Sequence, residues 1–159
     1  MFDVFIHGVP KAQPRPRARR AGNRVIMYDP RSAEEWRNAV AKAVGDCVDE
    51  FFDCPIELTL LFYFPRPKSH YGTGKNSELL KDAAPKYHTQ KPDLDNMCKA
   101  VMDSLNMVLY RDDSQVIQVN AQKLWAPRRG LEGLLLVAGE PQEALRDQVL
   151  LHRQCASQS

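Results

Sequence analysis

Two stretches of the chain repeat apolar residues at three- and four-residue steps, the pattern of a helix buried on one face. The first begins near Ser32, where Ser32 and Glu35 have the spacing of a capping box, and continues to Phe51. The second follows Pro92 and keeps its period as far as Leu105. We therefore expect two main helices. Their predicted apolar faces are Trp36, Val40, Val44, Cys47, Val48 and Phe51, and Leu94, Met97, Cys98, Val101, Met102 and Leu105.

Shorter patterns predict strands. Residues 56–64 are mostly apolar and rich in aromatic and branched residues, which is typical of a strand covered on both faces. Residues 116–125 alternate instead, with Ile117, Val119 and Ala121 toward one face and Gln118, Asn120 and Gln122 toward the other, as in a half-buried strand. Further strands are predicted at 2–9, 24–28 and 131–137. The order of elements predicts a single α+β domain with a mixed or antiparallel sheet packed on the two helices.

Two proline-rich segments separate these elements. Residues 10–20 contain three prolines, which exclude a helix or a central strand, so we expect an extended, exposed loop before a turn at Gly22. Residues 65–92 form the longest irregular segment, with a short helix expected around 78–83; loops of this length in a compact domain usually have a function. The domain is expected to span 1–140, followed by a C-terminal helix and tail at 141–159 that is partly disordered.

Composition narrows the class of protein. The chain has 159 residues, of which 43% are hydrophobic and 26% charged, which suits one globular domain and argues against a disordered chain. Its longest apolar stretches fall far short of the ~20 residues that span a membrane. The first residues lack the features of a signal peptide, so we expect a cytoplasmic protein, associated with the nucleoid if it binds DNA.

Charge is distributed unevenly along the chain. Residues 1–31 carry seven Lys/Arg against two acids and residues 65–92 carry six against two, whereas residues 93–113 carry two against five. The basic segments suit a phosphate-rich partner. Because carboxylates repel DNA, the acidic segment beside these basic segments suggests a metal ion.

The acidic segment contains a candidate metal site. Asp93 and Asp95 stand two apart at the start of the second helix, and Lys99 follows one turn later. If the strand after Asp112 and Asp113 runs back beside the helix start, one of that pair joins them. Three carboxylates in one pocket need a counter-charge, and Mg²⁺ prefers such oxygen ligands. Such an ion activates water for phosphodiester hydrolysis, and Lys99 would stabilise the developing negative charge.

Structural roles explain each of these residues separately. An aspartate at a helix start is usually a cap, Lys99 could form a surface ion pair with Asp103, and Asp-Asp before a strand is often a turn. Other sites are excluded by sequence: an EF-hand from Asp93 would need Gly and Glu where Cys98 and Ser104 stand, and there is no phosphate-binding loop for a nucleotide cofactor. No His or Cys cluster has zinc spacing, so we expect four reduced thiols at Cys47, Cys54, Cys98 and Cys155.

The basic segments are candidate DNA-binding elements. Prolines hold part of the first segment extended, which suits contact with a phosphate backbone. The second carries Tyr71 and Tyr87, either of which could stack on an unpaired base. Neither has a sequence-reading helix, so recognition by shape and phosphate is expected. The candidate nucleic-acid-binding residues are Lys11, Arg15, Arg17, Arg19, Arg20 and Lys91.

Several motifs together resemble the RusA family of Holliday junction resolvases, in particular its phage-type members. They are Lys91–Asn96 with Lys99 and Ala100, Asp103 with Leu105 and Asn106, Asp112–Val116 and a later Lys123. Further matches are Pro10-Lys11, Arg15–Arg17, Tyr28–Pro30 and Phe64–His70, so the resemblance covers about residues 2–138.

The resemblance implies a homodimeric, Mg²⁺-dependent endodeoxyribonuclease, with Mn²⁺ able to substitute. Such an enzyme resolves four-way DNA junctions by paired symmetric nicks in recombination and repair. The family's three catalytic, metal-binding aspartates correspond to Asp93, Asp95 and Asp113, with Asp112 as a stand-in for the last, and its essential lysine corresponds to Lys99. The alternatives are a non-catalytic branched-DNA-binding protein, a nuclease that prefers flaps or forks, and an interaction module whose aspartates only cap helices.

Overall fold

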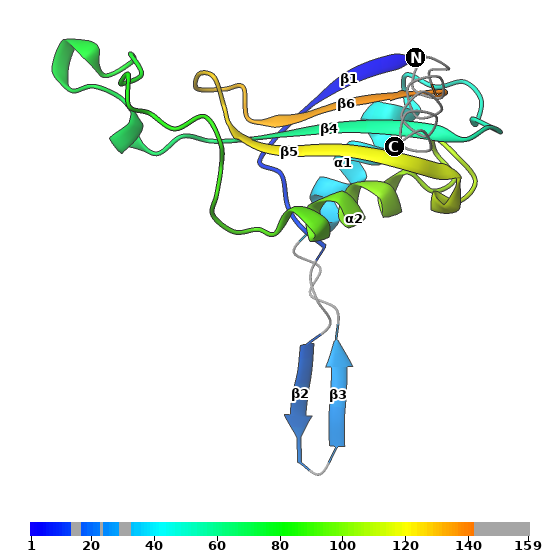
Figure 1. Ribbon diagram of the computed structural model, residues 1–159. Helices are drawn as coiled ribbons and strands as arrows, with labels where there is room; N and C mark the ends of the chain where they lie inside the picture. The colour runs from blue at the N-terminus through cyan, green and yellow to red at the C-terminus, as the bar shows by residue number, and fades with distance from the viewer. Residues whose placement is uncertain (14–16, 23, 29–32, 142–159) are drawn as a thin grey trace, which may run out of the picture.

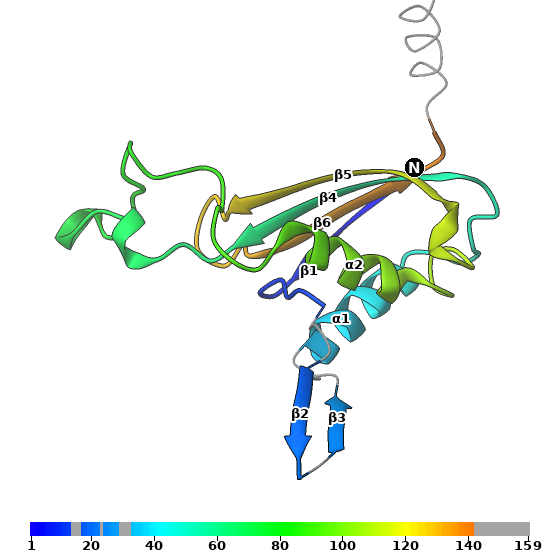
Figure 2. The ribbon, with the colours of Figure 1, turned by 60° about the horizontal axis from the view of Figure 1, so that its bottom comes forward.

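The computed structural model describes residues 1–13, 17–22, 24–28 and 33–141. Within them, a four-stranded sheet with the order β1-β6-β4-β5 lies against two helices, and a separate two-stranded hairpin projects from this body (Figures 1 and 2). The strands are β1 (Phe2–His7), β2 (Arg17–Ala21), β3 (Arg24–Tyr28), β4 (Ile56–Phe64), β5 (Val116–Trp125) and β6 (Gly133–Gly139). The helices are α1 (Glu34–Gly45) and α2 (Leu94–Leu105), with short 3₁₀ turns η2 (Lys68–His70), η3 (Gly74–Asn76) and η4 (Asp113–Gln115).

The sheet is mixed. β6 lies between β1 and β4 and is antiparallel to both, whereas β4 and β5 are parallel. Parallel neighbours need a crossover connection, and α2 lies within the one that joins β4 to β5. The predicted α+β fold with a mixed sheet on two helices is therefore confirmed.

The core lies between one face of the sheet and the two helices. In β4, Ile56, Leu58, Leu60, Phe62 and Phe64 are buried, while the residues between them are half-buried. Leu134, Leu136 and Ala138 continue the buried row on β6. The expectation that β4 is covered on both faces was wrong, because its second face, which includes the polar Glu57 and Thr59, keeps partial contact with solvent.

The first helix is shorter than its apolar period predicts. α1 ends at Gly45, and the next residue, Asp46, caps it through its backbone N–H and forms an ion pair with Lys42. The predicted positions Cys47, Val48 and Phe51 therefore lie outside the helix, and Phe51 is exposed. Trp36, Val40 and Val44 are buried as expected. Ser32, on which the predicted capping box depends, lies outside the described residues, and Ala33 is the N-cap of the helix.

The second helix confirms the prediction from Pro92 to Leu105. α2 buries Met97, Val101 and Leu105, together with Ala100 and Ser104. Leu94, Cys98 and Met102 are half-buried and pack against the core. Since the apolar stripe faces the sheet, the opposite face of α2 leaves its polar residues in solvent.

The two proline-rich segments contain more regular structure than expected. Residues 17–21, predicted as loop, pair as β2 with the predicted strand at 24–28, around a turn in which Gly22 has a positive φ of 62°. The short helix expected at 78–83 is absent from those described residues, which form turns and a bridge from Leu80 to Tyr71. The strands predicted at 2–9 and 131–137 are found at 2–7 and 133–139. The expected helix at 142–153 lies outside the described residues.

Among the described residues, no helix is long and apolar enough to cross a membrane.

Candidate functional site

The start of α2 carries two of the predicted acidic residues. Asp93 is the N-cap residue, with extended backbone, and its carbonyl accepts a hydrogen bond from the N–H of Met97 at 3.2 Å. Asp95 stands in the first turn of the helix, so it is not the cap. Both residues are exposed. A helix start favours negative charge because its first N–H groups point outward, which explains why two carboxylates are tolerated here.

Lys99 and Asp103 continue the same stripe of α2 toward its end. Their side chains form an ion pair of 3.8 Å, one helical turn apart, with the lysine side chain 63% exposed. The surface ion pair considered from the sequence is therefore present. An exposed pair of this kind is worth less than about 1 kcal/mol. Lys99 is accordingly held only weakly and faces solvent beside Asp95.

The end of β5 holds the segment that leads into α2. Lys123 donates from Nζ to the carbonyl oxygens of Gln90 and Pro92, at 2.5 and 2.7 Å. The backbone N–H of His88 donates to the carbonyl of Lys123 at 3.0 Å. These bonds tie residues 88–92 to the sheet and thereby fix where Asp93 and Asp95 lie. Lys123 is one of the motif residues named in the sequence, but its spacing from them does not indicate that it holds the segment before Asp93 in place.

The structure places Asp113 at the other end of α2. The chain leaves α2 at Leu105, turns through 106–112, and begins β5 beside the end of the helix, so the last residues of β5 lie beside its start. A 12-residue helix is about 18 Å long. The condition that would bring Asp112 or Asp113 to Asp93 and Asp95 within one chain is therefore not met.

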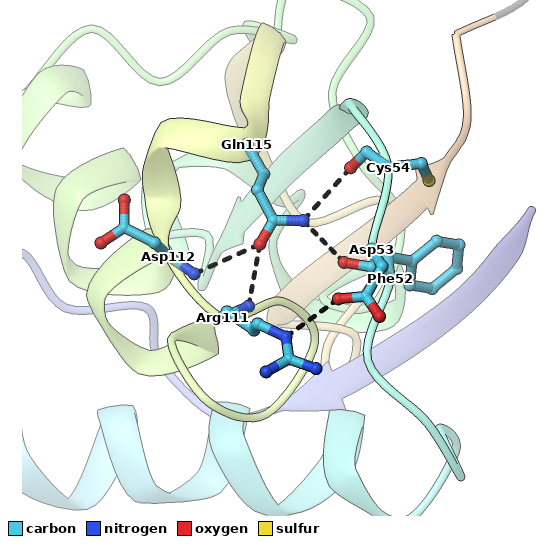
Figure 3. A network of polar contacts seen from close by, with 6 residues as sticks. All are labelled: Phe52, Asp53, Cys54, Arg111, Asp112 and Gln115. Carbon is cyan, nitrogen blue, oxygen red and sulfur yellow. Dashed lines mark hydrogen bonds and ion pairs between the residues drawn. The ribbon is translucent and has the colours of Figure 1, made fainter.

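Hydrogen bonds of the Gln115 side chain hold in place the turn to which Asp113 belongs (Figure 3). The side-chain oxygen of Gln115 accepts hydrogen bonds from the N–H groups of Arg111 and Asp112, at 3.0 and 3.3 Å. Its amide nitrogen donates to the carbonyls of Phe52 and Cys54, at 2.6 and 3.3 Å. Gln115 thus clamps the acidic turn to the segment before β4.

The acidic turn also has internal support. The carboxylate of Asp112 accepts a hydrogen bond from the N–H of Ser114 at 2.8 Å, and this bond holds the pKa of Asp112 below its usual value. With Gln115 it forms a capping box for η4. Asp112 therefore stabilises a turn, as one interpretation of the sequence expected. The neighbouring Asp113 is half-buried.

Tyr110 lies beneath this acidic end of the helix. Its ring is fully buried, and its hydroxyl donates to the carbonyl of Met102 at 3.0 Å. Burial raises the pKa of Tyr110 well above its usual value, and the charges of Asp113, Asp103 and Asp112 add to this. The phenol therefore stays neutral and serves as a structural support for the acidic residues around it.

The described carboxylates of one chain do not converge on a single metal site. Among the described residues, no group of three or more His, Cys, Asp or Glu side chains is arranged to hold a metal ion. Asp93 and Asp95 supply the oxygen chemistry that Mg²⁺ prefers, but the third aspartate lies a helix length away. A divalent ion held by Asp93 and Asp95 would complete its coordination with ligands other than Asp113 of the same chain.

The N-terminal basic segment joins the same end of α2. The backbone N–H of Gln13 donates to the carbonyl of Asn96, in the first turn of the helix, at 3.0 Å. Lys11, two residues earlier, and Lys91, two residues before Asp93, are both exposed. Arg17, Arg19 and Arg20 belong to β2, whereas Arg15 lies outside the described residues. The basic hairpin therefore begins from a point fixed beside the two aspartates.

Two remaining sequence candidates differ in exposure. Tyr71 is 3% exposed and lies under Arg129, so the prediction that it stacks on a base was wrong; Tyr87 is 55% exposed. Cys47, Cys54 and Cys98 are free thiols, as expected, and Cys155 lies outside the described residues. Burial raises the pKa of the Cys98 thiol, which keeps it protonated beside the acidic site.

Comparison with known proteins identifies the family of this chain. The family model described as Endodeoxyribonuclease RusA matches residues 7–132, about four-fifths of the chain. A Bacillus subtilis (strain 168) protein, named Uncharacterized protein YqaN, is 31% identical over 131 residues, which cover 82% of this chain and 92% of that protein. The matched range includes Asp93, Asp95, Lys99 and Asp113. The chain therefore belongs to the RusA family of endodeoxyribonucleases.

Proposed function

We propose that this protein is a Mg²⁺-dependent endonuclease that resolves four-way DNA junctions by paired, symmetric nicks. The observation that carries the proposal is that acidic residues and a basic segment lie together at the first turn of α2. Asp93 and Asp95 stand on that turn, and the basic N-terminal segment is bonded to it through Gln13 and Asn96. A nuclease needs this juxtaposition, because carboxylates alone repel the phosphates that they must help to cleave.

The metal site is proposed to form between two copies of the chain. A two-fold axis through the middle of α2, close to Lys99, would set two α2 helices antiparallel. The start of each helix would then lie beside the end of the other, so Asp93 and Asp95 of one copy would meet Asp113 of its partner. The carboxylates that fail to converge within one chain would be supplied as a set of three at each of two equivalent sites.

The surface beside α2 supports such a dimer. β5 is an edge strand of the sheet, and it leaves Ile117 58% and Val119 36% exposed next to the helix. Exposed apolar side chains on an edge strand favour contact with another protein surface. Two sites related by a two-fold axis also suit the nicking of two opposed strands in a junction with approximate two-fold symmetry.

Each residue has a distinct role in the proposed reaction. Asp93, Asp95 and Asp113 would hold Mg²⁺, which when bound supplies activation of water and stabilisation of charge on the phosphate. Lys99 lies between these groups on the helix and would stabilise the charge that develops on the scissile phosphate. Lys91, Lys11 and the basic hairpin would bind the phosphate backbone on either side.

Cleavage of a labelled immobile four-way junction tests the activity. With Mg²⁺, the wild-type protein should nick opposite strands of the junction symmetrically and leave a linear duplex intact. Asp95→Asn should fold and bind the junction but abolish cutting, because it removes one ligand charge without changing side-chain size. Binding without cutting by the wild type would indicate a non-catalytic junction-binding protein. Faster cutting of flaps or forks would change the substrate assignment.

Mixing two inactive variants tests the shared site. Asp95→Asn and Asp113→Asn should each be inactive alone. In a mixed dimer, one of the two sites would combine Asp95 from the second chain with Asp113 from the first, both intact. Single nicks should therefore reappear on mixing, at no more than about half the wild-type rate per dimer. If each site lies within one chain, both sites of the mixed dimer are defective and no cutting returns.

A further inference from the structure

A second basic surface lies at the end of the molecule beyond β4 and β5. Residues 65–88 form an extension, called here the arm, that reaches past the ends of these strands (Figure 1, green). Lys68, Lys75, Lys81 and Lys86 on the arm are all exposed, against two acids, Glu78 and Asp82. One of these acids, Glu78, is paired with Arg129 of the neighbouring turn at 3.2 Å. The arm is therefore strongly cationic.

Hydrogen bonds hold the arm in a defined backbone conformation. Arg66 at its base donates from Nε to the carbonyl of Ala126 and from Nη1 to that of Pro85, both at 2.7 Å, and so closes the two ends of the arm on each other. Toward its tip, Tyr71 and Leu80 form a bridge, and Lys81 donates from Nζ to the carbonyl of Ser69 at 2.9 Å. The backbone that carries the arm lysines is thus held in place before any partner binds.

Tyr87 stands where the arm returns to the sheet. On one side of it, the carbonyl of Lys86 accepts from the N–H of Trp125 at 2.9 Å; on the other, the N–H of His88 donates to the carbonyl of Lys123 at 3.0 Å. His88 is buried and stacked on Phe64, with ring centroids 4.0 Å apart. Because alternate residues of an extended segment point to opposite sides, Tyr87 is turned outward on a rigid backbone.

The surroundings of Tyr87 favour a nucleic-acid ligand. Its ring is 55% exposed, and Nζ of Lys86 lies 5.4 Å from the ring centroid. Exposed aromatic rings among cations bind unpaired bases by stacking while the cations hold the backbone. Tyr87 also precedes Asp93 by six residues, a length of chain that spans at most about 20 Å when extended. A base on this ring would therefore belong to a nucleotide close to the proposed cleavage site.

We propose that the arm is a second DNA-binding surface, in which Tyr87 stacks on a base at the branch point while Lys68 and Lys75 contact the phosphates of the adjoining duplex. This inference rests on the proposed function and adds to it a residue that distinguishes branched from linear DNA. In a linear duplex every base is stacked on both of its faces, so Tyr87 gains nothing there without the cost of extruding one. At a branch point the helical stack is interrupted, so a base at the end of an arm presents one face on which Tyr87 can stack.

Binding to uncut DNA tests the role of Tyr87. The full-length wild type, Tyr87→Ala and Tyr87→Phe are titrated, without divalent cations, against a four-way junction and a duplex of matched length. Tyr87→Ala should weaken junction binding about tenfold, within the range known for removal of one base stack, and leave duplex binding unchanged. Tyr87→Phe, which keeps the ring, should bind as the wild type does. A 2-aminopurine base at the branch point should lose fluorescence on binding wild type and Tyr87→Phe but not Tyr87→Ala.

Phe51→Ala is the matched control for Tyr87→Ala. Phe51 is also an exposed aromatic residue beside a cation, with the guanidinium carbon of Arg111 5.9 Å from its ring centroid. It lines a cleft of about 410 Å³ with Asp49, Glu50 and Asp53, where the acidic residues disfavour phosphate. Phe51→Ala should bind both DNAs as the wild type does.

Salt dependence tests the two arm lysines. The double variant Lys68→Ala, Lys75→Ala should reduce the slope of log K against log salt by about 0.9 for every phosphate that it no longer neutralises. An unchanged slope would overturn that part of the proposal. Junction binding that is unchanged in Tyr87→Ala, or weakened equally with duplex binding, would overturn the role of Tyr87 and leave its ring as a surface for protein contact. If the wild type neither binds nor cuts junctions, the proposed function itself fails.

Discussion

At the scale of single residues, the base of the arm depends on an aromatic cluster with a buried histidine. His88 stacks on Phe64, and its ring centroid lies 4.4 Å from that of Trp125. The rings of Trp125 and His70 are nearly perpendicular, with centroids 4.9 Å apart. Burial lowers the pKa of His88, and the positive charge of Lys123 lowers it further. Burial, with Arg66 and Lys81 nearby, also lowers the pKa of His70.

We predict that acid destabilises the fold through His88. The unfolded chain takes up a proton on this histidine near pH 6.5, whereas the folded protein does so only at lower pH. The unfolded state therefore binds more protons below pH 6.5, and the free energy of unfolding falls there by at most about 1.4 kcal/mol per pH unit for this group. His88→Phe keeps an aromatic ring but cannot titrate. Urea denaturation between pH 7.5 and 5.5 should show a smaller loss of stability in His88→Phe than in wild type.

The comparison needs a histidine outside the cluster. His7→Phe changes an exposed histidine on β1, outside the cluster, and serves as the control for the loss of a histidine. Part of the dependence should survive in His88→Phe, because His70 remains. Identical pH profiles for wild type and His88→Phe would show that His88 does not contribute.

At the scale of elements, the sequence predicted what depends on local periodicity. α2 appeared with its expected bounds because its apolar stripe is unbroken and Pro92 sets its start. α1 was predicted too long because Cys47, Val48 and Phe51 continue the period by chance beyond Gly45, where the helix ends. Of the hairpin formed by β2 and β3, only β3 was predicted. The prolines before β2 exclude a strand in the centre of a sheet, but they do not exclude a strand in an isolated two-stranded hairpin.

The candidate site was predictable only in part, for the same reason. Asp93, Asp95 and Lys99 share one helical stripe, so their neighbourhood follows from spacing alone. The place of Asp113 depends on the direction of β5 relative to α2, which is a tertiary property. The hydrogen bonds of Gln115 and Lys123 to distant carbonyls carry no periodic signal and become visible only in three dimensions.

We predict that Gln115 stabilises the element that presents Asp113. Gln115→Ala removes its hydrogen bonds to Arg111, Asp112, Phe52 and Cys54. Partly buried groups left without partners cost about 1–3 kcal/mol, so the free energy of unfolding should fall by about that amount. Amide exchange at residues 112–115 should become faster, and junction cutting should fall more than the loss of folded protein explains.

Gln122→Ala serves as the matched variant, because Gln122 is an exposed glutamine on β5, the strand that follows Gln115. It should change neither stability nor exchange at η4. If Gln115→Ala retains wild-type cutting while the protein stays folded, the clamp does not position a catalytic group.

At the scale of the whole molecule, clusters of charged residues lie at both ends of α2. The basic hairpin and Lys91 lie at its start, and the acidic turn at 112–113 lies at its end. In the dimer proposed above, each acidic end would face the start of the partner helix. Without a cation, this arrangement would bring carboxylates of two copies together and oppose association.

We therefore predict that Mg²⁺ promotes dimerisation. Sedimentation velocity at micromolar protein should show more dimer with 10 mM Mg²⁺ than with the same ionic strength of NaCl, following the binding linkage between ligand and assembly. Asp113→Asn should abolish this response. Asp82→Asn, which removes an exposed acid on the arm, should retain it. A dimer fraction that is independent of Mg²⁺ would contradict a metal site shared between copies.

The position of β6 has a consequence for how the protein is made. β6 is the last described strand, yet it lies inside the sheet and separates β1 from β4, pairing with both. Until the ribosome has released residues 133–139, β1 has no partner and β4 keeps an open edge. Truncated chains that stop before this strand would expose unpaired strand edges, which favour aggregation. The sheet should therefore be completed only after β6 has left the ribosome, so shorter products present no assembled acidic site to DNA.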